Sequence, residues 1–203
     1  MRISLPLVKY LTEHSQFERF MDEYETLHSR DEKGKFYANT IAGCLGIAHD
    51  LNSQKIPYCI IGGLAVAFHI HQVDHDAFLK WRGTSDIDLL VQKSAAEKIL
   101  RDEGYAFRDV KRGKKGAMNG IYDYAKDDNG EHLVLGLREH IEDQSGKDIT
   151  HKLLSGATNV DVYSIPVKVP MIRDLVDMKC FANRLKDRDD IKLLRSYYKG
   201  LKL

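Results

Sequence analysis

The sequence contains few cysteines, almost no net charge and no long apolar run. Three cysteines occur in 203 residues, and Cys44, Cys59 and Cys180 lie far apart without the spacing of a metal site. Two fall in helical patterns and one in an apolar strand, which predicts buried thiols in a reducing cytoplasm. No stretch approaches the length of a membrane-spanning helix, and the apolar run at the start is too short for a signal peptide. We therefore expect a cytoplasmic protein that has no membrane partner.

The charge balance argues against a general attraction to nucleic acid. Lysine and arginine number 31 and aspartate and glutamate 30, for a formal net charge of +1. Any nucleic-acid partner must therefore be held by a local basic patch. The dense basic run is Lys111-Arg112-Gly113-Lys114-Lys115-Gly116. It predicts either a solvated hairpin tip or a grip on a triphosphate or an RNA backbone.

What the sequence does contain is enough apolar material for one core. Hydrophobic residues make up 43% of the chain and charged residues 30%. This length and composition predict one domain with a small helical appendage. We expect N-terminal helices packed on the core at 1–55, the core itself at 56–170, and a helical C-terminal part that completes the site at 171–203.

Hydrophobic periodicity predicts helices mixed with short strands. Three-and-four spacing of apolar residues indicates helices at about 9–30, 36–54, 94–103 and 171–185. Short apolar or alternating runs indicate strands at 58–61, 86–91, 105–110, 160–165 and 167–169, and a hairpin formed by 121–125 and 132–137. The polar stretch 142–159 reads as a loop.

The first motif is a pair of glycines between a strand and a helix. The apolar run Tyr58–Ile61 is stopped by Gly62 and Gly63, and a helical pattern follows. Backbone N–H groups at the start of a helix have no partner within the helix, and the helix dipole favours an anion there. The glycines therefore mark either a phosphate-binding turn or simply a tight connection between strand and helix.

The second motif is an Asp-x-Asp at the start of an apolar strand. Alternate side chains of a strand share a face, so Asp86 and Asp88 project together while Ile87 projects to the other face. Adjacent carboxylates repel each other unless a cation lies between them, and Mg²⁺ binds one or two carboxylates together with substrate phosphates. A solvated strand end is the alternative for this pair alone. A phosphate-binding turn followed by a metal-binding strand is the layout of a nucleotidyl-transfer site.

The order strand, Gly-Gly, helix and R-x-T-x-D-I-D, the last spanning Arg82 to Asp88, resembles the polymerase-β-like nucleotidyltransferase superfamily. It is most similar to the branch that contains the AbiEii/AbiGii toxin nucleotidyltransferases. A second similarity lies in Lys179–Leu194, which resembles that branch's K-x-x-A-x-x-x-R-x-K-D-x-x-D-I/L motif with the alanine slightly displaced. A surface helix of alternating charge is the simpler interpretation of this second segment.

The resemblance implies an α/β (α+β) nucleotidyltransferase fold, with a short mixed sheet flanked by helices and a helical C-terminal part. It implies a metal-dependent enzyme that moves a nucleoside monophosphate from an NTP to an acceptor hydroxyl of RNA or tRNA type. The protein could then be the toxin of a toxin–antitoxin pair, with an antitoxin protein as partner. Mg²⁺ or Mn²⁺ is the expected cofactor.

The resemblance also assigns roles to particular residues. Asp86 and Asp88 would hold the metal. The nucleotide-binding group would be Gly62, Gly63, Arg82, Thr84, Lys179 and Arg184. The catalytic group would be Asp86, Asp88, Lys179 and Asp190, with Asp190 either holding Lys179 or acting as a base. Lys179 falls on an apolar helical stripe, so its cation needs an anionic partner, for which a triphosphate is suitable.

Two features depart from the superfamily pattern. The superfamily places a third carboxylate on a strand beside the Asp-x-Asp strand, but here that position falls near Val134, and Glu131, Asp123 and Asp161 are the nearest acids. Two other functions therefore stay open: a catalytically degenerate nucleotide-binding or interaction protein of the same fold, and a nucleotidyltransferase that acts on a small, antibiotic-type molecule. The segment 71–81 is also additional, and we expect a rim or lid there.

Overall fold

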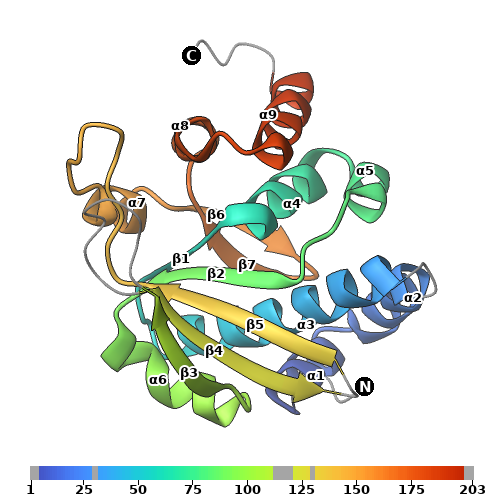
Figure 1. Ribbon diagram of the computed structural model, residues 1–203. Coiled ribbons are helices and arrows are strands. Elements are labelled where there is room, and N and C mark those ends of the chain that lie inside the picture. Colours follow the sequence, from blue (N-terminus) through green and yellow to red (C-terminus); the bar gives the residue numbers. More distant parts are fainter. Residues whose placement is uncertain (1–4, 29–31, 112–120, 129–130, 199–203) are drawn as a thin grey trace.

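The computed structural model describes residues 5–28, 32–111, 121–128 and 131–198 (Figure 1). The basic run expected at 111–116 lies outside the described residues except for its first lysine. The described elements are, in order, α1 (Leu5–Glu13), α2 (Phe17–His28), α3 (Glu32–Ser53), β1 (Tyr58–Ile61), α4 (Gly62–Val73), α5 (His75–Lys80), β2 (Asp86–Val91), α6 (Lys93–Asp102), β3 (Ala106–Lys111), β4 (Ile121–Asp128), β5 (Glu131–Arg138), α7 (Thr150–Ser155), β6 (Thr158–Val162), β7 (Ile165–Val169), α8 (Ile172–Ala182) and α9 (Leu185–Tyr197).

Five strands form a mixed sheet in the order β1-β2-β5-β4-β3. Strand β1 runs antiparallel to β2, β2 runs parallel to β5, and β4 runs antiparallel to both β5 and β3. Strands β6 and β7 form a separate antiparallel pair. This sheet, flanked by helices, confirms the predicted α/β (α+β) class with a short mixed sheet.

The two faces of the five-stranded sheet carry different side chains. Ile87 is buried on one face and lies close to Gly43 of α3. Asp86 and Asp88 alternate with it and project to the opposite face, as the strand pattern predicts. Helices α3 and α6 lie on the first side of the sheet, whereas α8 and α9 stand on the second side near β1 and β2 (Figure 1). The acidic face therefore looks towards the C-terminal helices.

The prediction of one helix over 9–30 is wrong, because two helices occupy this stretch. The break falls at Ser15, whose φ of 56° lies in the left-handed region, and Gln16 hydrogen-bonds back to Leu11. Both helices still bury apolar side chains against α3, so the periodicity indicated the buried face but not the interruption. The predicted helix before β1 and the predicted hairpin of β4 and β5 are confirmed.

The stretch 142–159 was predicted to be a loop, and this is wrong in part. Ile149 N–H donates to Ile141 O at 2.9 Å and Asp143 N–H donates to Lys147 O at 2.9 Å, which makes a short hairpin before α7. The carboxylate of Asp143 closes its tip by accepting from Ser145 N–H at 2.8 Å. Polar side chains thus supply the turn, and an alternating apolar pattern is absent because the hairpin is short.

Segment 71–81 completes α4 and forms the short helix α5. Asp74 caps α5, since its side chain accepts a hydrogen bond from Ala77 N–H at 2.8 Å. Trp81 belongs to the hydrophobic core, and the guanidinium of Arg82 lies over its ring. Of the three cysteines, Cys44 and Cys59 are buried as predicted, but Cys180 is exposed on α8. Within the described residues no helix has the length and apolar character needed to span a membrane.

Candidate functional site

The turn from β1 into α4 lies directly against the Asp-x-Asp strand. Gly62 has a φ of +72°, and a Cβ atom added to it would overlap the carboxylate of Asp88. A Cβ on Gly63 would lie 3.3 Å from Thr84 Cβ. Glycine is therefore required at position 62 by close approach and by its backbone angle, whereas Gly63 is in a tight contact that a small shift of Thr84 could relieve. The side chain of Ile61 offers no cap, so N–H groups at the start of α4 are available to an anion.

The two carboxylates of β2 share one face but have different partners. Asp88 lies opposite Ile61 of β1, beside the glycine turn, whereas Asp86 lies opposite Val134 of β5. The hydroxyl of Thr84 donates a hydrogen bond to Asp86. The guanidinium of Arg138 donates to Asp88, with 3.2 Å between Nη2 and Oδ1. Thr84 therefore orients Asp86.

This pair fits a divalent cation that is also held by substrate. Among the described residues no three His, Cys, Asp or Glu side chains gather as ligands of one metal ion. Mg²⁺ and Mn²⁺ favour oxygen ligands, and Mg²⁺ in nucleotide sites is commonly bound by one or two carboxylates and by phosphates. Asp86 and Asp88 supply such a set next to a turn that can hold phosphate. The histidines of segment 71–81 do not supply a metal site by this criterion.

Behind the carboxylate pair lies a buried ionic network formed by α8, α9 and the segment before β2. Lys179 Nζ is 2.7 Å from Asp190 Oδ2 and 3.2 Å from Asp187 Oδ1. Arg82 forms two hydrogen bonds with Asp190, of 3.1 Å from Nε and 2.8 Å from Nη2. All of these charges have partners, which buried charges require. The network fixes the C-terminal helices to the strand that carries the aspartate pair.

Arg184 joins this network from the loop between α8 and α9. Its Nε lies 2.6 Å from Asp187 Oδ2, and its backbone N–H also donates to that carboxylate. Burial raises the pKa of Asp187, but hydrogen bonds from Arg184 and Lys179 outweigh it and lower the pKa to about 2. The pKa of Arg184 is raised, mainly by its hydrogen bond to Asp187 and in smaller part by the charges of Asp86 and Asp88. Arg184 thus lies within the electrostatic reach of the aspartate pair.

The network changes the argument for two expected site residues. Lys179 was expected to need a phosphate as its anionic partner, but Asp187 and Asp190 supply that charge inside the protein. Asp190 is 1% exposed and accepts from both Arg82 and Lys179. Of its two expected roles, holding Lys179 is therefore the one that its contacts perform. Lys179 itself still lines the adjacent pocket.

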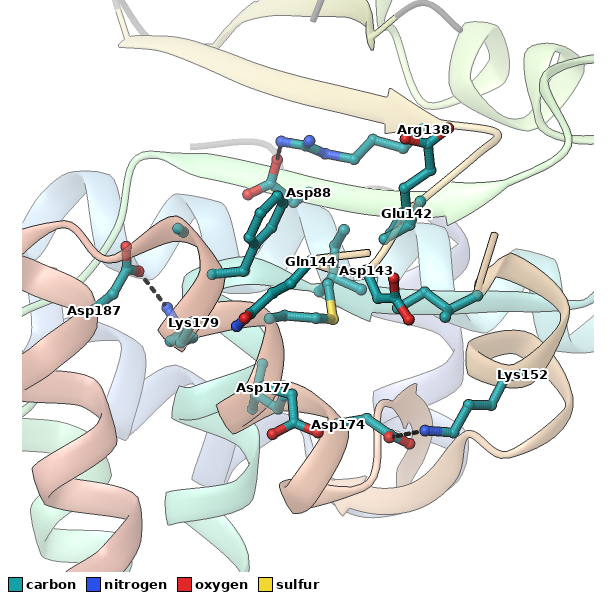
Figure 2. Close-up of a pocket in the computed structure, with 18 of the residues that line it drawn as sticks. Asp88, Arg138, Glu142, Asp143, Gln144, Lys152, Asp174, Asp177, Lys179 and Asp187 are labelled. Atoms are coloured by element: carbon teal, nitrogen blue, oxygen red, sulfur yellow. Dashed lines mark hydrogen bonds and ion pairs between the residues drawn. The ribbon is translucent and has the colours of Figure 1, made fainter. Parts of the chain in front are cut away.

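A pocket of about 1260 Å³ opens between the aspartate strand and α8. Figure 2 shows Asp88 and Arg138 on its sheet side, Lys179 and Asp187 at one end, and Asp174 with Asp177 on α8. The hairpin that follows β5 forms the remaining wall with Glu142 and Asp143. Gly62 also lines the pocket, so the glycine turn, one carboxylate of the pair and the buried lysine open into the same space.

A third carboxylate was expected on a strand beside the Asp-x-Asp strand, and β5 is a neighbour of β2. Among the β5 residues that pair with β2, those that share the face of the aspartate pair are Val134, Gly136 and Arg138, because Val134 lies opposite Asp86 and Gly136 opposite Asp88. None of these three residues is an acid. Asp123 lies one strand further away, opposite Gly136, and Asp161 is in the separate sheet. Val134, where the sequence comparison places this position, lies directly opposite Asp86.

Among the pocket residues that the sequence did not reveal are Arg138, His140 and Glu142. His140 Nε2 lies 3.1 Å from Glu142 Oε1, and its Nδ1 lies 3.2 Å from Asp148 Oδ2. All three follow or end β5, so they enter the site because β5 runs parallel to β2. These residues could have been predicted if β5 had been recognised as the parallel neighbour of the Asp-x-Asp strand, since the ends of parallel neighbours meet at one edge of a sheet.

Comparison with solved structures shows the same fold in the antibiotic-resistance factor ANT(2'')-Ia. Its solution structure matches with a TM-score of 0.54 and 14% identity, over 79% of this chain and 84% of that one. The crystal structure of ANT(2'')-Ia in complex with adenylyl-2''-tobramycin matches with a TM-score of 0.51 and 16% identity, over 74% of this chain and 84% of that one. No protein-family model and no characterised protein matches the sequence significantly. At these identities the likeness concerns the fold, and the predicted nucleotidyltransferase fold is confirmed.

Proposed function

We propose that this protein is a metal-dependent nucleotidyltransferase that moves a nucleoside monophosphate from an NTP to an acceptor hydroxyl. The observation that carries the proposal is the contact between the glycine turn and the aspartate pair: Gly62 lies so close to Asp88 that a single Cβ would not fit between them. A phosphate-binding helix start and Asp88 of the metal-binding carboxylate pair therefore share one pocket, as phosphoryl transfer requires.

In the proposed reaction the acceptor oxygen bonds to the α-phosphorus of the NTP, and the bond to the β-phosphate breaks, so that pyrophosphate leaves. The metal ion held by Asp86 and Asp88 would supply neutralisation of phosphate charge and acidify the hydroxyl. The N–H groups at Gly62 and Gly63 would hold the triphosphate. Lys179 and Arg184 would face it across the pocket, kept in place by Asp187.

Two different observations favour two different acceptors. The similarity to the AbiEii/AbiGii branch favours an RNA-type acceptor such as tRNA and, with it, a toxin that is paired with an antitoxin protein. The pocket favours a second candidate, a small cationic acceptor, because Glu142, Asp143, Asp174 and Asp177 line the wall formed by α8 and the hairpin. ANT(2'')-Ia, whose fold is similar, is known in complex with adenylyl-2''-tobramycin.

The proposal is tested by incubating the protein with each labelled NTP and Mg²⁺, together with either total RNA or an aminoglycoside. We expect the label to reach one acceptor class, and Asp88→Ala to abolish the transfer while the protein stays folded. The matched control is Asp189→Ala, which removes an exposed carboxylate of α9 and should leave transfer unchanged. NTP binding without transfer to any hydroxyl, under Mg²⁺ or Mn²⁺, would contradict turnover and favour the degenerate nucleotide-binding protein.

A further inference from the structure

Strand β5 brings a cation to the aspartate pair. Of the three residues on this face where β5 pairs with β2, Val134 and Gly136 are uncharged, and Arg138 at the end of the strand carries the charge. Its Nη2 lies 3.2 Å from Asp88 Oδ1, in a pair whose side chains are 36% and 23% exposed. Where it pairs with β2, the neighbouring strand thus offers Asp88 a counter-ion and no carboxylate ligand for a metal.

The Nε–H donor of Arg138 is not used within the described residues. A guanidinium carries five N–H donors, and its planar fork matches phosphate oxygens. The Nε atom of Arg138 is buried and has no hydrogen-bond partner among the described residues. An unsatisfied buried donor is costly, so such a group in a native structure indicates a missing acceptor. Both Arg138 and Asp88 line the pocket, which is open to an anionic ligand.

We propose that Arg138 is an exchangeable counter-ion of Asp88. In the metal-free protein its guanidinium neutralises the carboxylate; when a metal–NTP complex binds, the divalent cation takes over Asp88 and Arg138 turns its donors to the phosphates. This inference rests on the proposed function, since it concerns the same pocket. Arg138 then opposes the binding of metal alone and favours the binding of metal together with NTP.

Removal of the guanidinium should therefore change the two affinities in opposite directions. A partly exposed ion pair is modest in strength, so Arg138→Met should tighten the binding of Mn²⁺ alone by roughly three- to ten-fold. The same variant should weaken the binding of a non-hydrolysable NTP analogue in the presence of Mn²⁺ by about ten-fold, because charge-assisted hydrogen bonds to phosphate are lost. Substitution of a residue that only braces the end of β5 would produce neither change in affinity.

The test is a Mn²⁺ titration, followed by the signal of free Mn²⁺ in electron paramagnetic resonance, on the wild type, Arg138→Met and Arg138→Lys. Arg138→Lys keeps the charge and should keep the wild-type Mn²⁺ affinity. The matched control is Lys152→Met, which removes another pocket cation that is paired with Asp174, and it should leave the Mn²⁺ affinity unchanged. In the double variant Asp88→Asn/Arg138→Met the increase in Mn²⁺ affinity should disappear, because the carboxylate itself is lost.

An Arg138→Met protein that melts like the wild type and binds Mn²⁺ no more tightly overturns the inference; if this variant is unstable, Arg138→Gln is used in the same way. Tighter Mn²⁺ binding with unchanged affinity for the NTP analogue also overturns it, since the guanidinium then does not reach phosphate. Failure of the proposed function looks different: the wild type itself binds the NTP analogue with Mn²⁺ no better than Asp88→Asn.

Discussion

Gly62 is the residue at which backbone conformation and site chemistry meet. Gly62→Ala places a methyl group at a φ of +72°, where it also overlaps Asp88. Gly146→Ala is the matched control, because its φ is +79° but nothing lies within 4 Å of the added Cβ. The control should cost about 1–2 kcal/mol of unfolding free energy from backbone strain alone.

We expect Gly62→Ala to cost at least about 1 kcal/mol more than the control, because Asp88 must move. It should also reduce Mn²⁺ affinity, which the control should not. Urea unfolding and Mn²⁺ titration measure the two effects. Equal costs at both positions, with intact Mn²⁺ binding, would show that the turn and the aspartate are not in close contact.

Lys179 tests whether a buried cation belongs to the fold or to the ligand. Lys179→Met removes a partner from two carboxylates that are 0% and 1% exposed. Loss of one member of a buried ionic group costs about 3–5 kcal/mol, and here the lower end applies because Arg82 and Arg184 remain. Lys192→Met, at an exposed pair of 3.9 Å on α9, should change stability by less than about 0.5 kcal/mol.

Chemical denaturation of both lysine variants decides between the two roles. If Lys179→Met unfolds like the wild type while its affinity for an NTP falls by about ten-fold, the lysine acts mainly on phosphate, as the sequence motif implied. If stability falls and affinity per folded molecule is unchanged, the lysine holds the C-terminal helices.

At the scale of elements, the sequence correctly predicted the segments whose apolar pattern results from burial alone. The middle of α3, from Tyr37 to Ala48, and the whole of β1 are buried, and β2 is buried except at Asp86 and Asp88, so their apolar runs follow directly from burial. The break at Ser15 was missed because apolar spacing continues across it while the backbone does not. The hairpin at 141–149 was missed because hydrogen bonds from polar side chains, and not an apolar face, hold its turn.

The turn of this hairpin is held by the side chain of Asp143. The carboxylate of Asp143 accepts from Ser145 Oγ at 2.6 Å and from Lys147 N–H at 3.1 Å, in addition to Ser145 N–H. Asp143→Ala should therefore speed amide hydrogen exchange in the hairpin and leave exchange in β2 and β5 unchanged. Hydrogen-exchange mass spectrometry measures this. Uniformly faster exchange over the whole chain would mean that the hairpin is not a local unit.

At the scale of the whole molecule, much of the site could be predicted and its charge arrangement could not. The glycine turn, the aspartate pair and the lysine–aspartate helix are local motifs, so a linear pattern reveals them. Arg82 and Asp190 lie 108 positions apart, and Arg138 meets Asp88 across 50 positions. Such pairs depend on strand order and helix docking, which no short pattern contains.

His71 of α4, whose ring nitrogens are buried, makes stability depend on pH. Both ring nitrogens of His71 are buried without a hydrogen-bond partner among the described residues, and burial lowers its pKa to about 4. Between this value and the unfolded pKa of about 6.5, the unfolded chain binds the proton and the folded chain does not. Stability is therefore complete above pH 6.5 and falls as the pH drops towards 4, by at most about 3 kcal/mol.

His71→Phe should flatten this dependence, because the ring stays among Phe78 and Tyr163 but no longer titrates. The exposed His14 provides the control, since His14→Phe should keep the wild-type slope. Urea midpoints measured between pH 4 and 7 give both slopes. An unchanged slope in His71→Phe would assign the pH dependence to other groups.

The order in which the ribosome produces the elements has a consequence for when the site becomes competent. The glycine turn and the aspartate pair are synthesised early, but the residues of the buried ionic network from Lys179 to Asp190 follow all of the described strands. Chains fold as they are made, at about 5–20 residues per second. The strands are therefore synthesised before the charges that steady Arg82. The pocket cannot be complete until Asp187 of α9 has left the ribosome.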